Sequence, residues 1–175
     1  PAVSVLERYA LQSVVRDLLP GTITAKCLRV SFRSGGAVDV FHSPAHQSAS
    51  FGGLVTCGSV WNCPVCAAKI SERRRLELIA AIAAWEALGG FVVLLTLTHP
   101  HTRLDSLESL LEAETKALHR FFSSRQGVNL MSELGRVGQV RAWEVTHGRN
   151  REVNNGWHPH FHILLFLDKP LDSLI

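Results

Sequence analysis

Two apolar stripes at helical spacing and one strong helix-forming segment predict three helices. The first stripe follows a capping box at Ser4 and ends at Pro20-Gly21. The strong helix-forming segment ends at two glycines. The second stripe follows a cap at Asp105 and carries Leu107, Leu111, Leu118 and Phe122. This spacing predicts helices over about 4–19, 67–88 and 105–122, with irregular chain over 126–136.

Strand-like patterns occupy most of the remaining sequence. Short strands are predicted at 28–32 and 38–41, each followed by a loop rich in glycine and serine. The apolar, β-branched run 91–98 is typical of a central strand covered on both faces. Residues 137–146 and 157–167 flank a polar loop and predict an antiparallel hairpin. This order of elements predicts an α+β fold whose antiparallel sheet is packed by helices.

Three histidines alternate with apolar residues along the last predicted strand. Successive strand side chains point to opposite faces, so His158, His160 and His162 share one face. Phe161 and Ile163 share the other face, which we expect to pack on the core. Imidazoles two residues apart are close enough to bind one ion. The strand therefore predicts a divalent-cation site on its histidine face.

The preceding strand offers a carboxylate to the same face. If Trp143 lies opposite Phe161 in the hairpin, then Glu144 lies opposite His160, and a two-residue slip preserves this sidedness. A carboxylate beside imidazoles suits Mn²⁺ or Mg²⁺, and also Zn²⁺. The third ligand is left open between Glu144 and His158, since Glu144 could be a solvated strand charge.

A cysteine cluster predicts a second, different metal site. The segment 57–66 begins with one cysteine and ends in a Cys-x-x-Cys pair, which favours structural zinc over a redox pair or buried free thiols. A closed tetrahedral site needs a fourth ligand, for which we favour Cys27 and keep His42 and His46 as alternatives. The expected ligand set is Cys27, Cys57, Cys63 and Cys66.

Composition narrows the class of protein only slightly. The 175 residues carry a net charge of +3 and are 46% hydrophobic, and this length suits one domain, or one domain plus a small metal-stapled module. The mildly basic balance permits a nucleic-acid partner. No apolar run reaches the roughly 20 residues of a membrane span, and no signal peptide opens the sequence. We therefore expect an intracellular protein with no membrane partner.

These motifs together resemble a known family. The string from His158 to Leu165 resembles the second motif of plasmid Rep proteins, the rolling-circle replication initiators of the HUH endonuclease superfamily. Residues 95–98 resemble the first motif of these proteins, and residues 143–148 are similar to the segment that precedes their histidine motif. The similarity extends from about Cys27 to the end of the chain.

The resemblance implies an architecture and a reaction. It implies a palm-like, HUH or ferredoxin-like sheet over residues 67–175, behind a zinc-stapled portion over residues 1–66 that holds a helix and short strands. Catalytic Mn²⁺ or Mg²⁺ would act on single-stranded origin DNA, so that a tyrosine attacks the scissile phosphate. The implied partners are origin DNA and the host replication machinery, in the cytoplasm of a bacterium. The physiological cation and the oligomeric state stay open.

The tyrosine motif of the family is missing. The chain has one tyrosine, Tyr9, which lies in the first predicted helix without a lysine three residues later. We read Tyr9 as structural and expect the nucleophile beyond residue 175, so that this polypeptide binds metal and DNA without cleaving.

Several residues are candidates for DNA contact. Basic side chains follow the cysteine cluster and flank the hairpin, Trp157 offers a stacking surface, and two threonines lie on the strand beside the histidines. These candidates are Arg73, Arg74, Arg141, Arg149, Trp157, Thr96 and Thr98. The alternatives are a relaxase or transposase of the same chemistry, a non-catalytic zinc-containing DNA-binding module, and a small-molecule metallohydrolase.

Overall fold

The computed structural model describes residues 4–148 and 154–171, which form two compact units. The first unit is Pro1–Ile79 and the second is Ala80–Ile175, so the boundary falls inside the long helix α3 (Pro64–Ala87). Each unit has its own buried core: one is built around cysteines and the other around one face of a sheet.

Short elements make up the first unit. Its first helix begins with the predicted capping box, in which Ser4 Oγ accepts from the Glu7 amide at 3.2 Å and Glu7 Oε2 accepts from the Ser4 amide at 2.6 Å. Two of the backbone donors that lack intrahelical partners at this helix end are thereby satisfied. In order, the elements are α1 (Val5–Leu18), α2 (Ile23–Lys26), β1 (Asp39–Ser43), η1 (Pro44–His46), β2 (Ser48–Gly52) and the start of α3.

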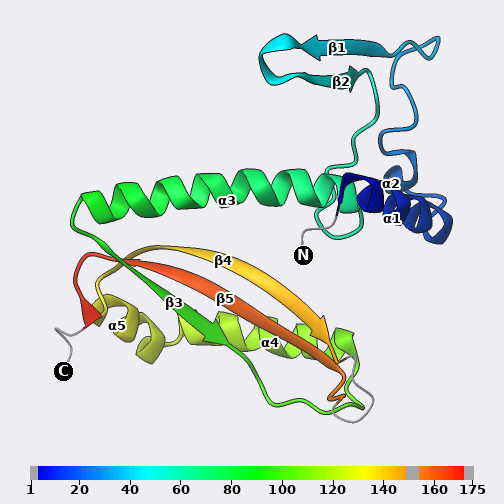
Figure 1. The fold of residues 1–175 in the computed structure, drawn as a ribbon. Coiled ribbons are helices and arrows are strands. Elements are labelled where there is room, and N and C mark those ends of the chain that lie inside the picture. The colour runs from blue at the N-terminus through cyan, green and yellow to red at the C-terminus, as the bar shows by residue number, and fades with distance from the viewer. Residues whose placement is uncertain (1–3, 149–153, 172–175) are drawn as a thin grey trace. The chain divides into compact units, whose positions relative to one another are not determined.

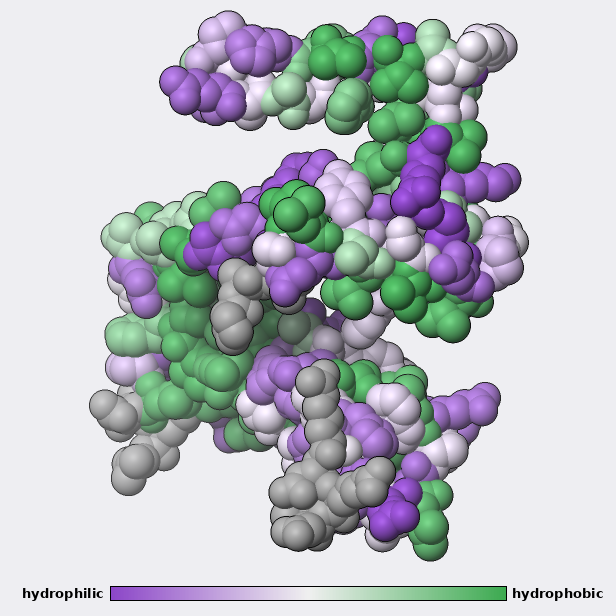
Figure 2. All heavy atoms as spheres, turned by 45° about the vertical axis from the view of Figure 1, so that its right-hand side comes forward, coloured by the Kyte–Doolittle hydropathy of each residue, from purple (hydrophilic) through white to green (hydrophobic). Residues whose placement is uncertain are grey.

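The strand expected at 28–32 does not form, and that prediction is wrong. Leu28 has a left-handed backbone (φ 58°), which interrupts extended chain, and only Ser31 makes an isolated bridge, to Leu54. The strand predicted at 38–41 is present as β1 and pairs antiparallel with β2. Val40 and Phe51 of this hairpin are exposed apolar side chains. Figure 2 colours hydrophobic residues of the protein green.

Three antiparallel strands form the sheet of the second unit (Figure 1). They are β3 (Phe91–Leu97), β4 (Arg136–His147) and β5 (Trp157–Leu167), in the order β3-β5-β4. The predicted strand positions are confirmed, but the prediction that 91–98 is central is wrong. The central strand is β5, and Leu94 on the edge strand β3 is 58% exposed. The apolar run of β3 resembles a central strand because Val93, Leu95 and Leu97 join the core while Val92 and Leu94 on the other face are also apolar.

One face of this sheet carries the core of the second unit. Ile163, Leu165 and Leu167 on β5 are buried there with Leu118 of α4 (Leu107–Ser123) and Met131 of α5 (Arg125–Glu133). The buried stripe of α4 differs from the predicted one and consists of Leu110, Glu114 and Leu118. The α+β class with an antiparallel sheet packed by helices is confirmed.

Helix α5 replaces the irregular chain expected over 126–136. Ser124 caps it, since its Oγ accepts from the Gly127 amide at 3.0 Å. Gly127 is buried, and a Cβ at this position would overlap the carbonyl oxygen of Phe121. The tight junction between α4 and α5 therefore depends on glycine.

We expect Gly127→Ala to destabilise the second unit by about 1–3 kcal/mol, the usual cost of overpacking. The added methyl group would meet a backbone atom, which cannot rotate away. Gly138→Ala is the matched control, because a Cβ there meets nothing within 4 Å. Urea denaturation of both variants tests this expectation, and equal free energies of unfolding would contradict it.

No helix within residues 4–148 and 154–171 is both long enough and apolar enough to cross a bilayer.

Candidate metal centres

The hairpin register brings the histidine strand and its carboxylate together. Strands β4 and β5 pair so that Trp143 lies opposite Phe161 and Glu144 lies opposite His160, which is the predicted register. On the core face, the Trp143 and Phe161 rings stack with centroids 4.9 Å apart. This contact fixes the register, and the opposite face then presents Glu144 beside His160 and His162.

The distances in this cluster suit one divalent cation. Glu144 Oε2 lies 3.1 Å from His162 Nε2 and 3.4 Å from His160 Nε2, and the three ligand atoms all lie within 4.8 Å of one another. Neighbouring ligands lie about 3.0 Å apart around octahedral Mg²⁺ and about 3.4 Å apart around tetrahedral Zn²⁺. The donor set therefore fits a divalent cation without selecting which one.

Hydrogen bonds prepare both imidazoles as ligands. His160 Nδ1 lies 3.3 Å from the carbonyl oxygen of His158, to which it can donate a hydrogen bond when a cation takes the Nε2 lone pair. His162 Nδ1 lies 3.1 Å from the hydroxyl of Thr96. When each Nδ1 donates, each Nε2 lone pair is available to a cation that Glu144 also binds. Such outer contacts orient and strengthen metal ligands. Without a cation, His162 Nε2 can instead donate to Glu144 Oε2 at 3.1 Å.

His158 lies beside this cluster and outside the group of three. Its ring lies 4.9 Å from the His160 ring and 4.8 Å from the His101 ring. Burial lowers the pKa of His158, and the charges of His101 and His160 lower it further. The His158 imidazole therefore favours its neutral form, next to a cluster that needs neutral imidazoles.

The four cysteines converge in the first unit. The Sγ atom of Cys66 lies 3.5 Å from that of Cys27 and 3.7 Å from that of Cys57, and the Cys63 and Cys27 sulfurs are 3.8 Å apart. Ligands of a tetrahedral zinc ion with Zn–S bonds of about 2.3 Å lie about 3.8 Å apart. All four are free thiols. Their arrangement fits a closed zinc site, and His42 in β1 and His46 in η1 are not part of the group.

Backbone and side-chain donors surround these sulfurs. The amides of Cys57, Ser59 and Cys66 donate to cysteine sulfurs at 3.4–3.5 Å. Gln12 is 2% exposed, and its Nε2 contacts both the Cys63 sulfur at 3.5 Å and the Cys27 carbonyl at 3.2 Å. Burial raises the pKa of the Cys27 thiol. A bound cation would reverse this preference for the protonated thiol, because zinc binds the thiolate.

The residues suggested for DNA contact belong to different elements and to different faces of the sheet. Thr96 lies at the histidine face and Thr98 follows β3, whereas the register puts Arg141 on the opposite face from Glu144. Trp157 begins β5, with its ring 4.5 Å from that of His147. Arg73 and Arg74 are exposed on α3 in the first unit, and Arg73 pairs with Glu77 at 2.8 Å. Arg149 lies outside the described residues.

Sequence reasoning missed Gln12 and Glu114. Gln12 supports the cysteine cluster, and Glu114 accepts a hydrogen bond from Trp143 Nε1 at 3.1 Å behind the histidine strand. Glu114 stands four residues from both Leu110 and Leu118, so a charged residue in the middle of a buried stripe was the available signal. Gln12 gave no comparable signal, because it does not interrupt a buried apolar stripe. Most apolar residues of α1 are exposed, and Gln12 is the buried residue of this helix.

Comparisons with known proteins extend over much of both units. The family model described as "Replication protein" matches residues 54–171. "Protein rep" of Streptomyces lividans is 33% identical over 144 residues, covering 66% of this chain and 30% of that protein. "Neomycin resistance protein" of Streptomyces cyanogenus is 30% identical over 154 residues, covering 73% of this chain and 34% of that protein. No solved structure matches.

The chain spans about a third of the length of these curated relatives. The matched region contains both the histidine strand and the three clustered cysteines of 57–66. Because the family model covers more than half of the sequence, the resemblance to replication initiators is confirmed, and the chain belongs to the replication protein family.

Proposed function

We propose that this chain is the metal-binding part of a plasmid rolling-circle replication initiator of the HUH endonuclease type. Its activity in the whole protein is the nicking and joining of single-stranded DNA at a replication origin. The observation that carries the proposal is the convergence of His160, His162 and Glu144 on one open face of the sheet. Two imidazoles and a carboxylate leave coordination positions for phosphate oxygens.

The residues around this face have distinct roles in the proposed reaction. Mn²⁺ or Mg²⁺ bound there would polarise the scissile phosphate as a Lewis acid. Thr96 holds the His162 ring through Nδ1, and the His158 carbonyl holds the His160 ring in the same way. Glu144 is 52% exposed at its side chain and His160 is 12% exposed, so solvent and substrate reach the cluster from the carboxylate side.

The cysteine site has a structural role in this proposal. Four thiolates close a tetrahedral shell, which leaves no position for substrate. Cys27 lies between α2 and the loop that leads to the β1–β2 hairpin, whereas Cys63 and Cys66 lie at the start of α3. Zinc bound by these four cysteines would tie segments far apart in sequence into one small unit, which we equate with the zinc-stapled portion predicted for residues 1–66.

The proposed reaction also needs a tyrosine nucleophile, and the position of this tyrosine supplies the test of the proposed function. A tyrosine hydroxyl attacks phosphorus, the 3′ oxygen leaves as a hydroxyl, and the 5′ phosphate stays on the tyrosine. Tyr9 lies in α1, in the other unit from the histidine face. We propose that the reacting tyrosine lies beyond residue 175 of the whole protein.

We expect the 175-residue chain to bind single-stranded origin DNA without forming a covalent adduct. Extending it by the following coding sequence should give an adduct that needs Mn²⁺ or Mg²⁺ and withstands denaturing electrophoresis. Tyr9→Phe in the extended protein is the control and should leave the adduct yield unchanged. An adduct formed by the 175-residue chain and abolished by Tyr9→Phe would contradict the assignment.

A further inference from the structure

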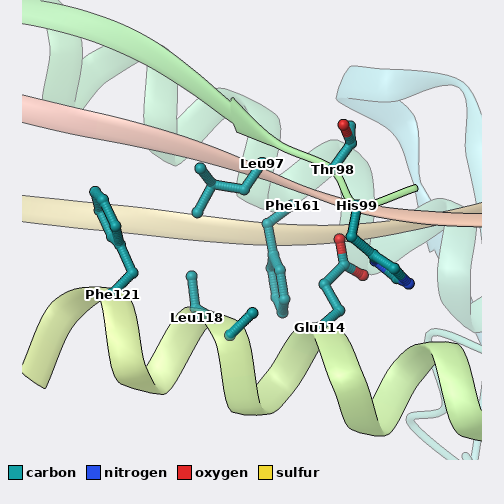
Figure 3. Close-up of a pocket in the computed structure, with 8 residues that line it drawn as sticks. Leu97, Thr98, His99, Glu114, Leu118, Phe121 and Phe161 are labelled. Atoms are coloured by element: carbon teal, nitrogen blue, oxygen red, sulfur yellow. The ribbon is translucent and has the colours of Figure 1, made fainter.

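A pocket of about 220 Å³ lies on the other face of the sheet from the histidine cluster, between the end of β3 and helix α4. Its walls are mostly apolar, as Figure 3 shows, with Leu97, Phe161 and Phe121 around the cavity. Thr98 and Ala117 line it and are exposed, so the pocket reaches solvent at this edge. The lining residues all belong to the second unit.

One end of this pocket carries polar atoms that have no partner. Glu114 is 3% exposed, and its Oε2 accepts from Trp143, but its Oε1 is buried without a hydrogen bond among the described residues. Both ring nitrogens of His99 are likewise buried and unpaired within that part of the chain. Figure 3 shows the Glu114 carboxylate and the His99 ring at the same end of the cavity. Buried polar atoms without a partner are costly, which favours a ligand that satisfies them.

The size and chemistry of the pocket restrict that ligand. A cavity of about 150 Å³ holds benzene, so this one has room for a planar heteroaromatic ring against Phe161. A carboxylate oxygen such as Glu114 Oε1 accepts and needs an N–H group, whereas an N–H of the His99 ring needs an acceptor. A ring with an amino group next to a ring nitrogen or carbonyl meets both needs. Cytosine, adenine and guanine have this edge, and carboxylates accept from the cytosine amino group in known readout.

The pocket lies close to the candidate metal site along β3. Thr96 contacts the metal-ligand candidate His162, and Thr98, two residues later, lines the pocket. Phe161 on β5 stands between His160 and His162 in sequence and points to the opposite face. A single strand whose phosphate lies at the histidine face could therefore place a neighbouring, unstacked base over the edge of the sheet.

We propose that this pocket binds one extruded nucleobase that carries an exocyclic amino group, read by Glu114 and His99. The proposal rests on the proposed function, because it takes single-stranded DNA as the ligand of the adjacent site. It adds a base-selective contact to a metal centre that by itself recognises only the phosphate.

The test compares oligodeoxycytidine with oligodeoxythymidine, each of about twelve nucleotides, by fluorescence anisotropy with Mn²⁺ present. The wild-type chain should bind oligodeoxycytidine about tenfold more tightly, since thymine has no amino group. Glu114→Gln should remove or reverse this preference. Its amide oxygen accepts from Trp143, and its NH₂ group then faces the pocket as a donor that suits a thymine carbonyl.

Ala117→Phe offers a second, independent variant that fills the pocket from an exposed helix position. It should reduce oligodeoxycytidine affinity to the level of oligodeoxythymidine. Ala113→Phe, one turn earlier on α4 and outside the pocket lining, is the matched control and should keep the preference. Equal affinities of the wild-type chain for the two oligonucleotides would overturn the base pocket alone. Absence of binding to either oligonucleotide would overturn it together with the proposed function.

Discussion

Replacing both His160 and His162 with alanine is expected to weaken Mn²⁺ binding at the histidine face by more than about 100-fold. Loss of one outer-shell contact alone typically costs 10–100-fold in metal affinity, and these substitutions remove two of three ligand atoms. Glu144, which is half exposed, would remain as a single carboxylate. Isothermal titration calorimetry with Mn²⁺ on zinc-loaded protein measures the change.

A matched histidine substitution separates this effect from a general loss of surface imidazoles. His119 is exposed on α4, away from the three-residue group, so His119→Ala should bind Mn²⁺ like the wild-type chain. His158→Ala probes the alternative third ligand and should retain most of the affinity, because Glu144 completes the group. A larger loss for His158→Ala than for Glu144→Ala would show that the roles of these two residues are reversed.

Substituting Cys63 with serine is expected to release zinc and unfold the first unit. Cys63 and Cys27 are fully buried, and the core of this unit consists chiefly of the cysteine cluster. Structural zinc contributes on the order of 10 kcal/mol to the folding of small domains, more than such a core can replace. Zinc analysis together with limited proteolysis of residues 4–79 measures the outcome.

The two histidines proposed from sequence as alternative ligands provide the controls. His42→Ala and His46→Ala should retain stoichiometric zinc, whereas Cys27→Ser should lose it as Cys63→Ser does. Retention of zinc and protease resistance by Cys27→Ser, with loss in either histidine variant, would contradict the four-cysteine site.

The sequence predicted the histidine face well because strand geometry has a period of two. Once Trp143 and Phe161 are assigned to one face, Glu144 must join His160 and His162 on the other. A shift of the strand pairing by two residues would not change this sidedness. The cysteine spacing was equally informative about which residues could share a metal. Both predictions depend on local patterns with few alternatives.

Features set by tertiary packing were not predictable in this way. Helix α5 needs the close approach of Gly127 to Phe121, which no local propensity signals. The apolar run of β3 suits a central strand. The order of strands, however, depends on which strand pairs with each edge of β5. Glu114 contradicts the apolar stripe of its own helix, and such conflicts between pattern and burial often mark functional positions.

Anomalous diffraction from crystals soaked in Mn²⁺ tests the central claim most directly. A peak within bonding distance of His160 Nε2, His162 Nε2 and a Glu144 carboxylate oxygen is the predicted result. A fully occupied manganese site elsewhere, with no peak among these three side chains, would contradict a catalytic cation at the histidine face.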